Sequence, residues 1–486
     1  MMSEYTIKID KNEWEIVCGL EIHCQIISKS KIFSAASTQF GDEANENVSF
    51  VDLGMPGMLP VLNEHCVYQA VKTGLGLNAQ INKYSVFSRK NYFYPDQPNG
   101  YQITQYEYPI VGKGFVKIGL SDGSSKEIGI TRIHIEQDAA KSIHDLNPKK
   151  SYIDFNRAGV GLMEIVTEPD FSSPEEAGAF LKKLRSIVRY LGTCDGNMDE
   201  GSMRCDASIS VRLKGEKTLR ERAEIKNVNS VKFVMQAIEN EAKRQIEIYE
   251  QGGIIEQQTR HFDPQTGTTK FMRKKEYAND YRYFPEPDLP PLYLTDEYIE
   301  KVKSEMVELP DAKKERFIKD YGLTAYDADV LTESVELADF FEKAAKGHDG
   351  KKVANWILGD LFANLNANKL TLDKSPVAPQ MIGDLVDLIS KGVISGKIAK
   401  DVFATMWQTK QMPTQIVEEK GLKQVSDSGA IESMIDSVLA ANPENIAAYK
   451  AGKTNLFGFF VGQVMKQSKG AANPQMVGEI LKKKLG

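Results

Sequence analysis

Charged and apolar side chains alternate along several short stretches in the first part of the chain. In GLEIHCQI, Glu21 and His23 alternate with Ile22 and Cys24. Successive side chains of a β-strand point to opposite faces of a sheet, so a strand here would carry polar residues on one face only. The same alternation in RIHIEQD, GLMEIVTE, RCDASISVR and RAEIKN contributes Arg132, His134, Glu136, Asp138, Glu164, Glu168, Arg204, Asp206, Arg222, Glu224 and Lys226.

This crowding of carboxylates has two interpretations. Taken alone, each of these stretches is typical of a half-buried strand whose polar face meets solvent. If the strands are neighbours in one sheet, however, the carboxylates repel each other unless cations compensate them. Hard oxygen ligands with one imidazole suit Mg²⁺ or Mn²⁺ better than Zn²⁺. The spacing alone leaves both a divalent-metal site and a plain solvent face open.

Other common site motifs are missing or incomplete. No C-x₂-C pair occurs, which removes the usual zinc-finger spacing. The Gly-Lys-Thr at 452–454 has Ala447 where a phosphate loop needs its first glycine, and Gly159 and Gly161 lack the third glycine of a dinucleotide fingerprint. No G-x-S-x-G marks a serine nucleophile.

Two further stretches combine aromatic and charged residues. Residues 91–109, NYFYPDQPNGYQITQYEYP, fit a hairpin that turns at Pro98-Asn99-Gly100 with aromatics paired across its strands. The same tyrosines and amides also suit stacking on an unpaired nucleotide. Residues 280–291, DYRYFPEPDLPP, are either a linker or a charged loop at a site, and both interpretations stay open.

The elements that must position these residues are strands before about residue 290 and helices after it. A capping box at Ser173 with a stop at Gly192 predicts one helix, and a second is predicted from about Val231 to Gly252-Gly253. The four prolines of residues 285–291 exclude both helix and central strand. Helical periodicity dominates beyond them, so the sequence predicts an α+β front and an all-helical back.

Composition and charge narrow the class of protein. The 486 residues carry 67 acidic and 61 basic side chains, a net charge of −6, which is typical of a soluble globular protein and not of a chain that binds nucleic acid over its whole surface. From Ala441 on, however, seven lysines stand against two glutamates. That end therefore suits a polyanion, with Lys453, Lys466 and Lys469 as candidate phosphate contacts.

Cysteines and the N-terminus bear on the compartment. Five scattered cysteines form no disulfide framework, which favours a reducing, cytoplasmic setting. The first twenty residues lack a basic segment followed by an apolar one, and no uninterrupted apolar run reaches about 18 residues. We therefore expect neither export nor membrane insertion.

The sequence resembles a known family along nearly its whole length. GLEIHCQI, KNYFYPDQPNGYQITQYEYPI, DFNRAGVGLMEIVTEPDF and DYRYFPEPDLPPL are similar to motifs of the B-subunit family of aspartyl/glutamyl-tRNA amidotransferases, GatB. The stretches from ANWILGDL to GFFVGQVMKQSKGAANP resemble that family's helical and YqeY-like domains. The resemblance implies a cradle domain with an antiparallel sheet over residues 1–294, a helical domain over 295–410 and a tRNA-binding tail over 411–486.

The resemblance also implies a reaction and partners. The family works as a heterotrimer in which the A subunit, an amidase, releases ammonia from glutamine and a C subunit clamps the other two. ATP and Mg²⁺ serve to phosphorylate the side-chain carboxylate of glutamate on tRNA-Gln, or of aspartate on tRNA-Asn, and ammonia then displaces the phosphate. This chemistry makes the chain a ligase that forms C–N bonds.

Site roles follow by motif. The family's metal ligands fall on Glu21, His23, Glu136 and Glu164. Glu136, Arg204 and Lys226 are the expected catalytic residues, while Asp206, Glu224 and Arg282 are expected near ATP.

One departure from the family concerns zinc. Many members carry a zinc knuckle of one C-x-C and one C-P-x-C pair, and the corresponding residues here are Ser34-Ala35-Ala36 and Ser49-Phe50-Val51-Asp52. We therefore expect no structural zinc, and expect packing to hold residues 31–54.

Two alternatives remain at this stage. One is a tRNA-binding subunit without catalysis, which the intact set of carboxylates and histidine disfavours. The other is a stand-alone metal-dependent phosphotransferase for small substrates, which does not explain the lysine-rich tail.

Overall fold

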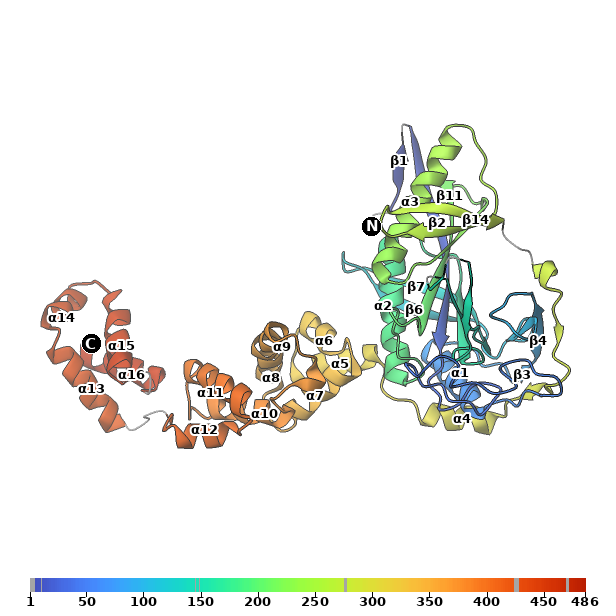
Figure 1. The fold of residues 1–486 in the computed structure, drawn as a ribbon. Coiled ribbons are helices and arrows are strands. Elements are labelled where there is room, and N and C mark those ends of the chain that lie inside the picture. The colour runs from blue at the N-terminus through green and yellow to red at the C-terminus, as the bar shows by residue number, and fades with distance from the viewer. Residues whose placement is uncertain are drawn as a thin grey trace. The chain divides into compact units, whose positions relative to one another are not determined.

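The chain forms two compact units, Met1–Pro310 and Asp311–Gly486, each drawn as a ribbon in Figure 1. The computed structural model describes residues 5–9, 11–144, 146–147, 149–274, 278–423, 428–468 and 472–486. The first unit combines a large sheet with helices and the second is helical, which confirms the predicted fold class. The division of the helical part at residue 410 stays a prediction.

A nine-stranded sheet lies at the centre of the first unit. Its order is β14-β13-β12-β11-β2-β10-β7-β6, and β1 pairs with β2. Neighbours run antiparallel except β12 and β13, which are parallel because helix α3 connects them as a crossover. The strands are β1 (Ile7–Ile9), β2 (Asn12–Gln25), β6 (Gly114–Gly119), β7 (Ser125–Gln137), β10 (Gly161–Thr167), β11 (Met203–Leu213), β12 (Ala223–Lys226), β13 (Gln258–Asp263) and β14 (Thr268–Lys274).

Three helices, α1 (Glu64–Gly76), α2 (Pro174–Leu191) and α3 (Val231–Glu250), pack against the sheet (Figure 1). The apolar residues of the alternating strands face them and are buried in one core. Helix α2 begins at the predicted cap, where the Ser173 hydroxyl accepts from the amide of Glu176, and it ends at left-handed Gly192. The opposite face of the sheet is thereby left to the polar residues.

Helix α1 was not predicted. Its sequence, EHCVYQAVKTGLG, contains two glycines and three β-branched residues, which have low helix propensity. Burial of Cys66, Val67, Ala70 and Val71 against the sheet stabilises it, and the Asn63 side chain caps its first turn.

The proline-rich segment is part of the first unit and not an open linker. Strand β15 (Phe284–Pro285) extends the hairpin of β4 (Phe87–Asn91) and β5 (Tyr101–Gln105), and β16 (Leu292–Tyr293) pairs with β3 (Tyr84–Ser85). Proline is tolerated there because these are edge strands. Glu286, 2% exposed, accepts two hydrogen bonds from the Arg89 guanidinium, which fixes the segment to the hairpin. Shorter elements complete the unit: β8 (Lys141–Ile143), β9 (Tyr152–Asp154), the 3₁₀ turn η1 (Ala278–Tyr281) and α4 (Asp296–Ser304).

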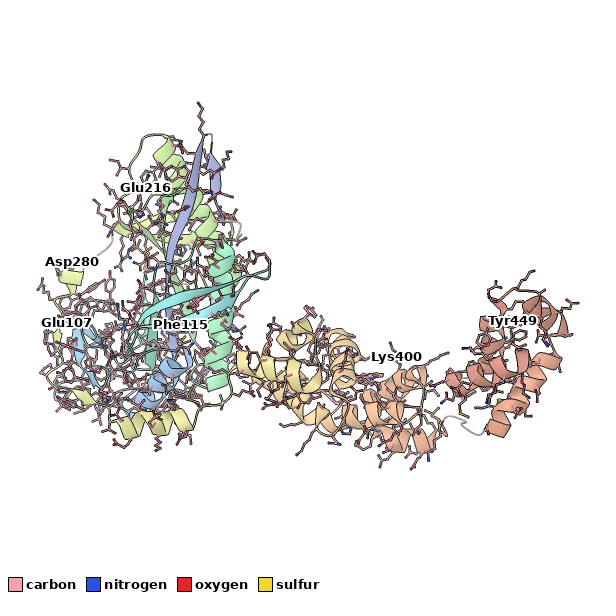
Figure 2. All side chains as sticks on the ribbon, turned by 180° about the vertical axis from the view of Figure 1, so that it is seen from behind. Glu107, Phe115, Glu216, Asp280, Lys400 and Tyr449 are labelled. Carbon is pink, nitrogen blue, oxygen red and sulfur yellow. The ribbon has the colours of Figure 1, made fainter. Side chains whose placement is uncertain are left out.

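The second unit consists of helices separated by short turns. Residues 350–367 form α8 and α9 with a π-helical turn, η2, between them. Its C-terminal part, which contains Tyr449 (Figure 2), buries a core of its own around Ile435, Phe460 and Leu481. The elements are α5 (Pro310–Tyr321), α6 (Ala325–Leu331), α7 (Val335–Ala345), α8 (Gly350–Trp356), η2 (Ile357–Leu361), α9 (Phe362–Ala367), η3 (Leu372–Lys374), α10 (Pro379–Ser390), α11 (Gly396–Thr409), α12 (Pro413–Glu419), α13 (Ser428–Ala440), α14 (Pro443–Lys450), α15 (Leu456–Gln467) and α16 (Pro474–Leu485).

Among the residues that the structure describes, no helix has both the length and the apolar character needed to cross a bilayer.

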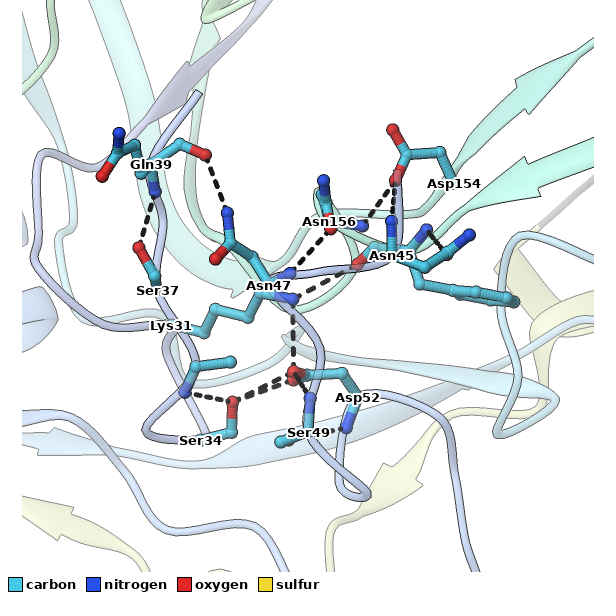
Figure 3. A network of polar contacts seen from close by, with 12 residues as sticks. Lys31, Ser34, Ser37, Gln39, Asn45, Asn47, Ser49, Asp52, Asp154 and Asn156 are labelled. Atoms are coloured by element: carbon cyan, nitrogen blue, oxygen red, sulfur yellow. Dashed lines mark hydrogen bonds and ion pairs between the residues drawn. The ribbon is translucent and has the colours of Figure 1, made fainter. Parts of the chain in front are cut away.

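A buried ion pair holds the loop where the family's zinc knuckle lies (Figure 3). The Lys31 ammonium is 3.2 Å from an Asp52 carboxylate oxygen and also donates to the Phe155 carbonyl. Asp52 further accepts from the Ser34 hydroxyl and the Ser49 amide. Packing alone was expected for residues 31–54; the structure adds this polar network, made by the residues that replace three of the knuckle's four cysteines. The absence of zinc stays a prediction.

Glycine is required where this loop meets the segment that leads into strand β10. Gly159 has φ +80°, and a Cβ there would lie 2.6 Å from the Asp52 carboxylate. The Gly159 and Gly161 pair therefore has a packing role.

Substitution of Asp52 by Ala should destabilise this loop strongly. Removing one partner of a buried ion pair leaves the other charge unpaired, at a cost of about 3–5 kcal/mol. Native-state hydrogen exchange of residues 31–54 would measure the loss of stability of this loop. The matched control is Asp296→Ala, which removes the carboxylate of an exposed pair with Lys83 and should change little. Equal protection of the loop in both variants would contradict the role given to Asp52.

Candidate active site

Strand register aligns four polar residues on the face of the sheet opposite the helices. His134 of β7 is the partner of Glu164 on β10, Glu164 that of His23 on β2, and His23 that of Arg204 on β11. Directly opposed residues of antiparallel strands share a face, so these side chains lie side by side. We call His134, Glu164, His23 and Arg204 the central row.

The two imidazoles of the central row both contact one carboxylate. The Nε2 atoms of His23 and His134 each lie 3.3 Å from Oε2 of Glu164. The Nε2 of His134 also lies 3.5 Å from Oε2 of Glu136, whose oxygen accepts a hydrogen bond from the Thr104 hydroxyl. His134 and Glu136 are only 5% and 3% exposed, so the contacts are made in a poorly solvated setting.

The protonation of this cluster reflects that crowding. Burial by itself lowers the pKa of His134, but Glu164 and Glu136 outweigh it and raise that pKa to about 9. Burial also lowers the pKa of His23, but the contact with Glu164 raises it, and the net pKa of His23 is raised. Burial raises the pKa of Glu164, while His134 and His23 hold it well below its usual value. The shared carboxylate of Glu164 thus favours the protonated form of both imidazoles.

The cluster offers a fitting set of metal ligands. One ligand atom each from His23, Glu136 and Glu164 lies within 4.8 Å of the others. Two carboxylates and one imidazole suit Mg²⁺ or Mn²⁺. The fourth expected ligand, Glu21, is not in this group; it lies further along β2, opposite Val166 and Asp206. The structure therefore brings three of the four expected ligands together.

His134 was not among the expected site residues. The alternation in RIHIEQD places it on the same face as Glu136, but only the pairing of β7 with β10 brings it against Glu164. Its Nδ1 atom is buried and has no hydrogen-bond partner within the described part of the chain.

The two expected catalytic cations are each held by a carboxylate of this chain. Arg204 donates from both terminal nitrogens to Asp138, at 3.0 Å each. Lys226 lies 2.5 Å from Asp206 and 2.9 Å from Glu224. Burial lowers the pKa of Lys226, but these two carboxylates outweigh it and raise the pKa. Asp206 and Glu224, expected near ATP, thus position Lys226, and Asp138 positions Arg204.

A tyrosine pair joins the hairpin to residues 280–291. The rings of Tyr106 and Tyr283 stack at 4.2 Å with an angle of 6° between their planes. Burial raises the pKa of Tyr283, and Glu136 and Glu164 raise it further. Tyr106 therefore stacks on residues 280–291 instead of across its own hairpin. Figure 2 shows Glu107 and Asp280, from the same two segments, on one side of the first unit.

The remaining expected residues are exposed or lie outside what is described. Arg282 is exposed, with a positive φ of 48°, directly before Tyr283. Lys453 and Lys466 are exposed in the second unit, and Lys469 lies outside the described residues.

Comparison with known proteins decides the family. A sequence profile of the GatB/GatE catalytic domain matches residues 16–300, and one of the GatB domain matches residues 339–485. The chain belongs to the GatB family. It is 58% identical over 481 residues to the B subunit of the aspartyl/glutamyl-tRNA(Asn/Gln) amidotransferase of Paramagnetospirillum magneticum, covering 99% of both chains. The proteins of the same name from Acidiphilium cryptum and Rhodospirillum rubrum are each 59% identical, again over 99% of both chains.

Membership assigns the cluster to the catalytic part of a GatB chain, since the central row lies entirely within the profile of the catalytic domain. The chain is therefore a GatB-type ligase subunit, and the polar face of the large sheet is the candidate for its site.

Replacement of Glu164 by Gln should weaken Mn²⁺ binding by at least about tenfold, because even outer contacts of metal ligands contribute roughly 10–100-fold to affinity. Mn²⁺ titration followed by electron paramagnetic resonance measures the dissociation constant. Glu127→Gln, an exposed change on the same strand β7 as Glu136, is the control. Equal Mn²⁺ affinity for both variants would exclude Glu164 as a ligand.

Proposed function

We propose that this GatB chain phosphorylates and then amidates the side-chain carboxylate of glutamate on tRNA-Gln, of aspartate on tRNA-Asn, or of both. ATP supplies the phosphoryl group and Mg²⁺ is the metal. The observation that carries the proposal is the convergence of His23, Glu136 and Glu164, with Arg204 next in the central row. The catalytic-domain match and the names of the relatives support the same activity.

The first step joins two anions, the substrate carboxylate and the γ-phosphoryl group of ATP. A carboxylate oxygen attacks the γ-phosphorus, the bond to the bridging oxygen of ADP breaks, and an acyl phosphate and ADP result. His23, Glu136 and Glu164 would hold a Mg²⁺ ion, whose charge screens the two anions from each other. Arg204 and Lys226 lie on the same face, where Asp138, Asp206 and Glu224 fix their positions.

The second step forms the amide. The nitrogen of ammonia attacks the acyl carbon, the bond to phosphate breaks, and a proton leaves the nitrogen as phosphate departs. This chain contributes no evident glutaminase nucleophile, because its five cysteine thiols are all buried. The ammonia is therefore assigned to an amidase A subunit, with a C subunit completing the heterotrimer in the cytoplasm.

The tail of the second unit is assigned to tRNA. This tail has a small core of its own, and its lysines Lys453 and Lys466 are exposed to solvent. Exposed ammonium groups neutralise phosphates and release counterions on binding.

Replacement of Glu136 by Gln should abolish ATP-dependent amide formation, with at least about a 100-fold loss, as expected when an electrostatic catalytic group is removed. Glutamine keeps the size and still accepts from Thr104, so the fold should survive. The assay is formation of Gln-tRNA-Gln from Glu-tRNA-Gln by the complex with its A and C subunits. Near-normal amide formation would overturn the assignment. If the wild-type complex binds tRNA but does not turn over ATP, the non-catalytic alternative is favoured. If the wild-type complex turns over ATP independently of tRNA, the small-substrate phosphotransferase is favoured.

The double variant Lys453→Gln/Lys466→Gln should weaken tRNA binding and flatten its salt dependence. Each lost phosphate contact lowers the slope of log K against log salt by about 0.7–0.9, so the double variant should lose about 1.5. Filter binding at several salt concentrations measures the slope. Lys374→Gln/Lys400→Gln, two exposed lysines outside the tail, is the control. An unchanged slope in the tail variant would contradict phosphate contact.

A further inference from the structure

The positive charges of Arg204 and Lys226 are already compensated by carboxylates of this chain. Arg204 uses both terminal nitrogens on Asp138, and Lys226 contacts two carboxylates. Binding of the substrate carboxylate or the phosphoryl group nevertheless calls for a cation whose donors are still available. A guanidinium or ammonium group without a carboxylate partner would meet that need.

Arg132 is such a group. It precedes His134 by two residues on β7 and is the register partner of Val166, which stands two residues after Glu164. Its Nε atom is buried without a hydrogen-bond partner, and no described carboxylate lies within ion-pair distance of its guanidinium. A buried donor without an acceptor is costly, so such a group normally has a partner.

Arg132 lies on the same sheet face as His134, directly after a bulge in β7. Val166 faces Arg132, whereas the next residue, Thr167, faces Ile130, so that Thr131 is the extra residue. Bulges of this kind re-aim side chains next to active sites. Because the extra residue reverses the alternation of side chains, the isoleucines on both sides of the bulge point into the core: Ile128, Ile130, Ile133 and Ile135.

Arg132 also acts electrostatically on Tyr283. Its charge opposes the increase in the pKa of that tyrosine caused by burial, Glu136 and Glu164.

We propose that Arg132 binds an oxyanion of the substrates, either the side-chain carboxylate to be amidated or a phosphoryl oxygen of ATP. The inference rests on the proposed function and adds to it a substrate-binding residue. The planar guanidinium suits either oxyanion, because both accept two parallel hydrogen bonds.

The test compares Arg132→Gln and Arg132→Lys in the complex with the A and C subunits. Ammonium chloride serves as nitrogen donor, so that glutamine hydrolysis is bypassed. The control is Arg212→Gln, which removes a guanidinium of β11 that is paired with Glu15 outside the site. Three quantities are measured: kcat and KM for Glu-tRNA-Gln, the dissociation constant of ATP without tRNA, and the thermal unfolding midpoint.

Arg132→Gln should lower kcat/KM by about 100-fold at an unchanged unfolding midpoint, and Arg132→Lys should recover part of the loss. An increased KM for Glu-tRNA-Gln with unchanged ATP binding identifies the carboxylate, whereas weaker ATP binding identifies the phosphoryl group. A kcat/KM of Arg132→Gln within threefold of wild type would overturn the proposal. An equal loss of kcat/KM in Arg132→Gln and Arg132→Lys, accompanied by a lower unfolding midpoint, would overturn it as well. An inactive wild-type complex would instead contradict the proposed function itself, and this assignment with it.

Discussion

The contact of two imidazoles with the Glu164 carboxylate is the interaction on which the rest of the site depends. Ligand oxygens of Glu136 and Glu164 lie within 4.8 Å of each other in a poorly solvated region, and the imidazoles of His23 and His134 contact these carboxylates there. A divalent ion held by the same oxygens would compensate their charge.

The sheet makes this arrangement possible by separating its two faces. Helices α1, α2 and α3 bury the apolar residues of each alternating strand, so the polar residues must share the other face. Register then decides which of them meet, since a shift by one residue would turn every side chain to the wrong face. The stack of Tyr283 on Tyr106 holds residues 280–291 against the hairpin.

The sequence predicts the parts of this site that depend on local pattern. Alternation places His23, Glu136 and Glu164 on polar strand faces, a capping box predicts α2, and the helix predicted from Val231 to Gly252-Gly253 is α3. The contact of His134 with Glu164 was not predicted, because it depends on β10 lying between β7 and β2. Helix α1 and the Lys31–Asp52 pair were missed for the same reason: tertiary burial and not local propensity stabilises them. The motif-based expectation for Glu21 likewise could not show that it lies outside the group formed by His23, Glu136 and Glu164.

We propose that His23, and not His134, would coordinate the metal, because the group of described ligand atoms that lie within reach of one ion contains His23 with Glu136 and Glu164, while His134 contacts both carboxylates from the side. Electron spin echo modulation of Mn²⁺ bound to ¹⁵N-histidine-labelled protein tests this directly, because a coordinated imidazole nitrogen couples to the metal's electron spin. The account predicts coupling to one imidazole that persists in His134→Gln and disappears in His23→Gln. Coupling that is lost in His134→Gln and retained in His23→Gln would contradict it.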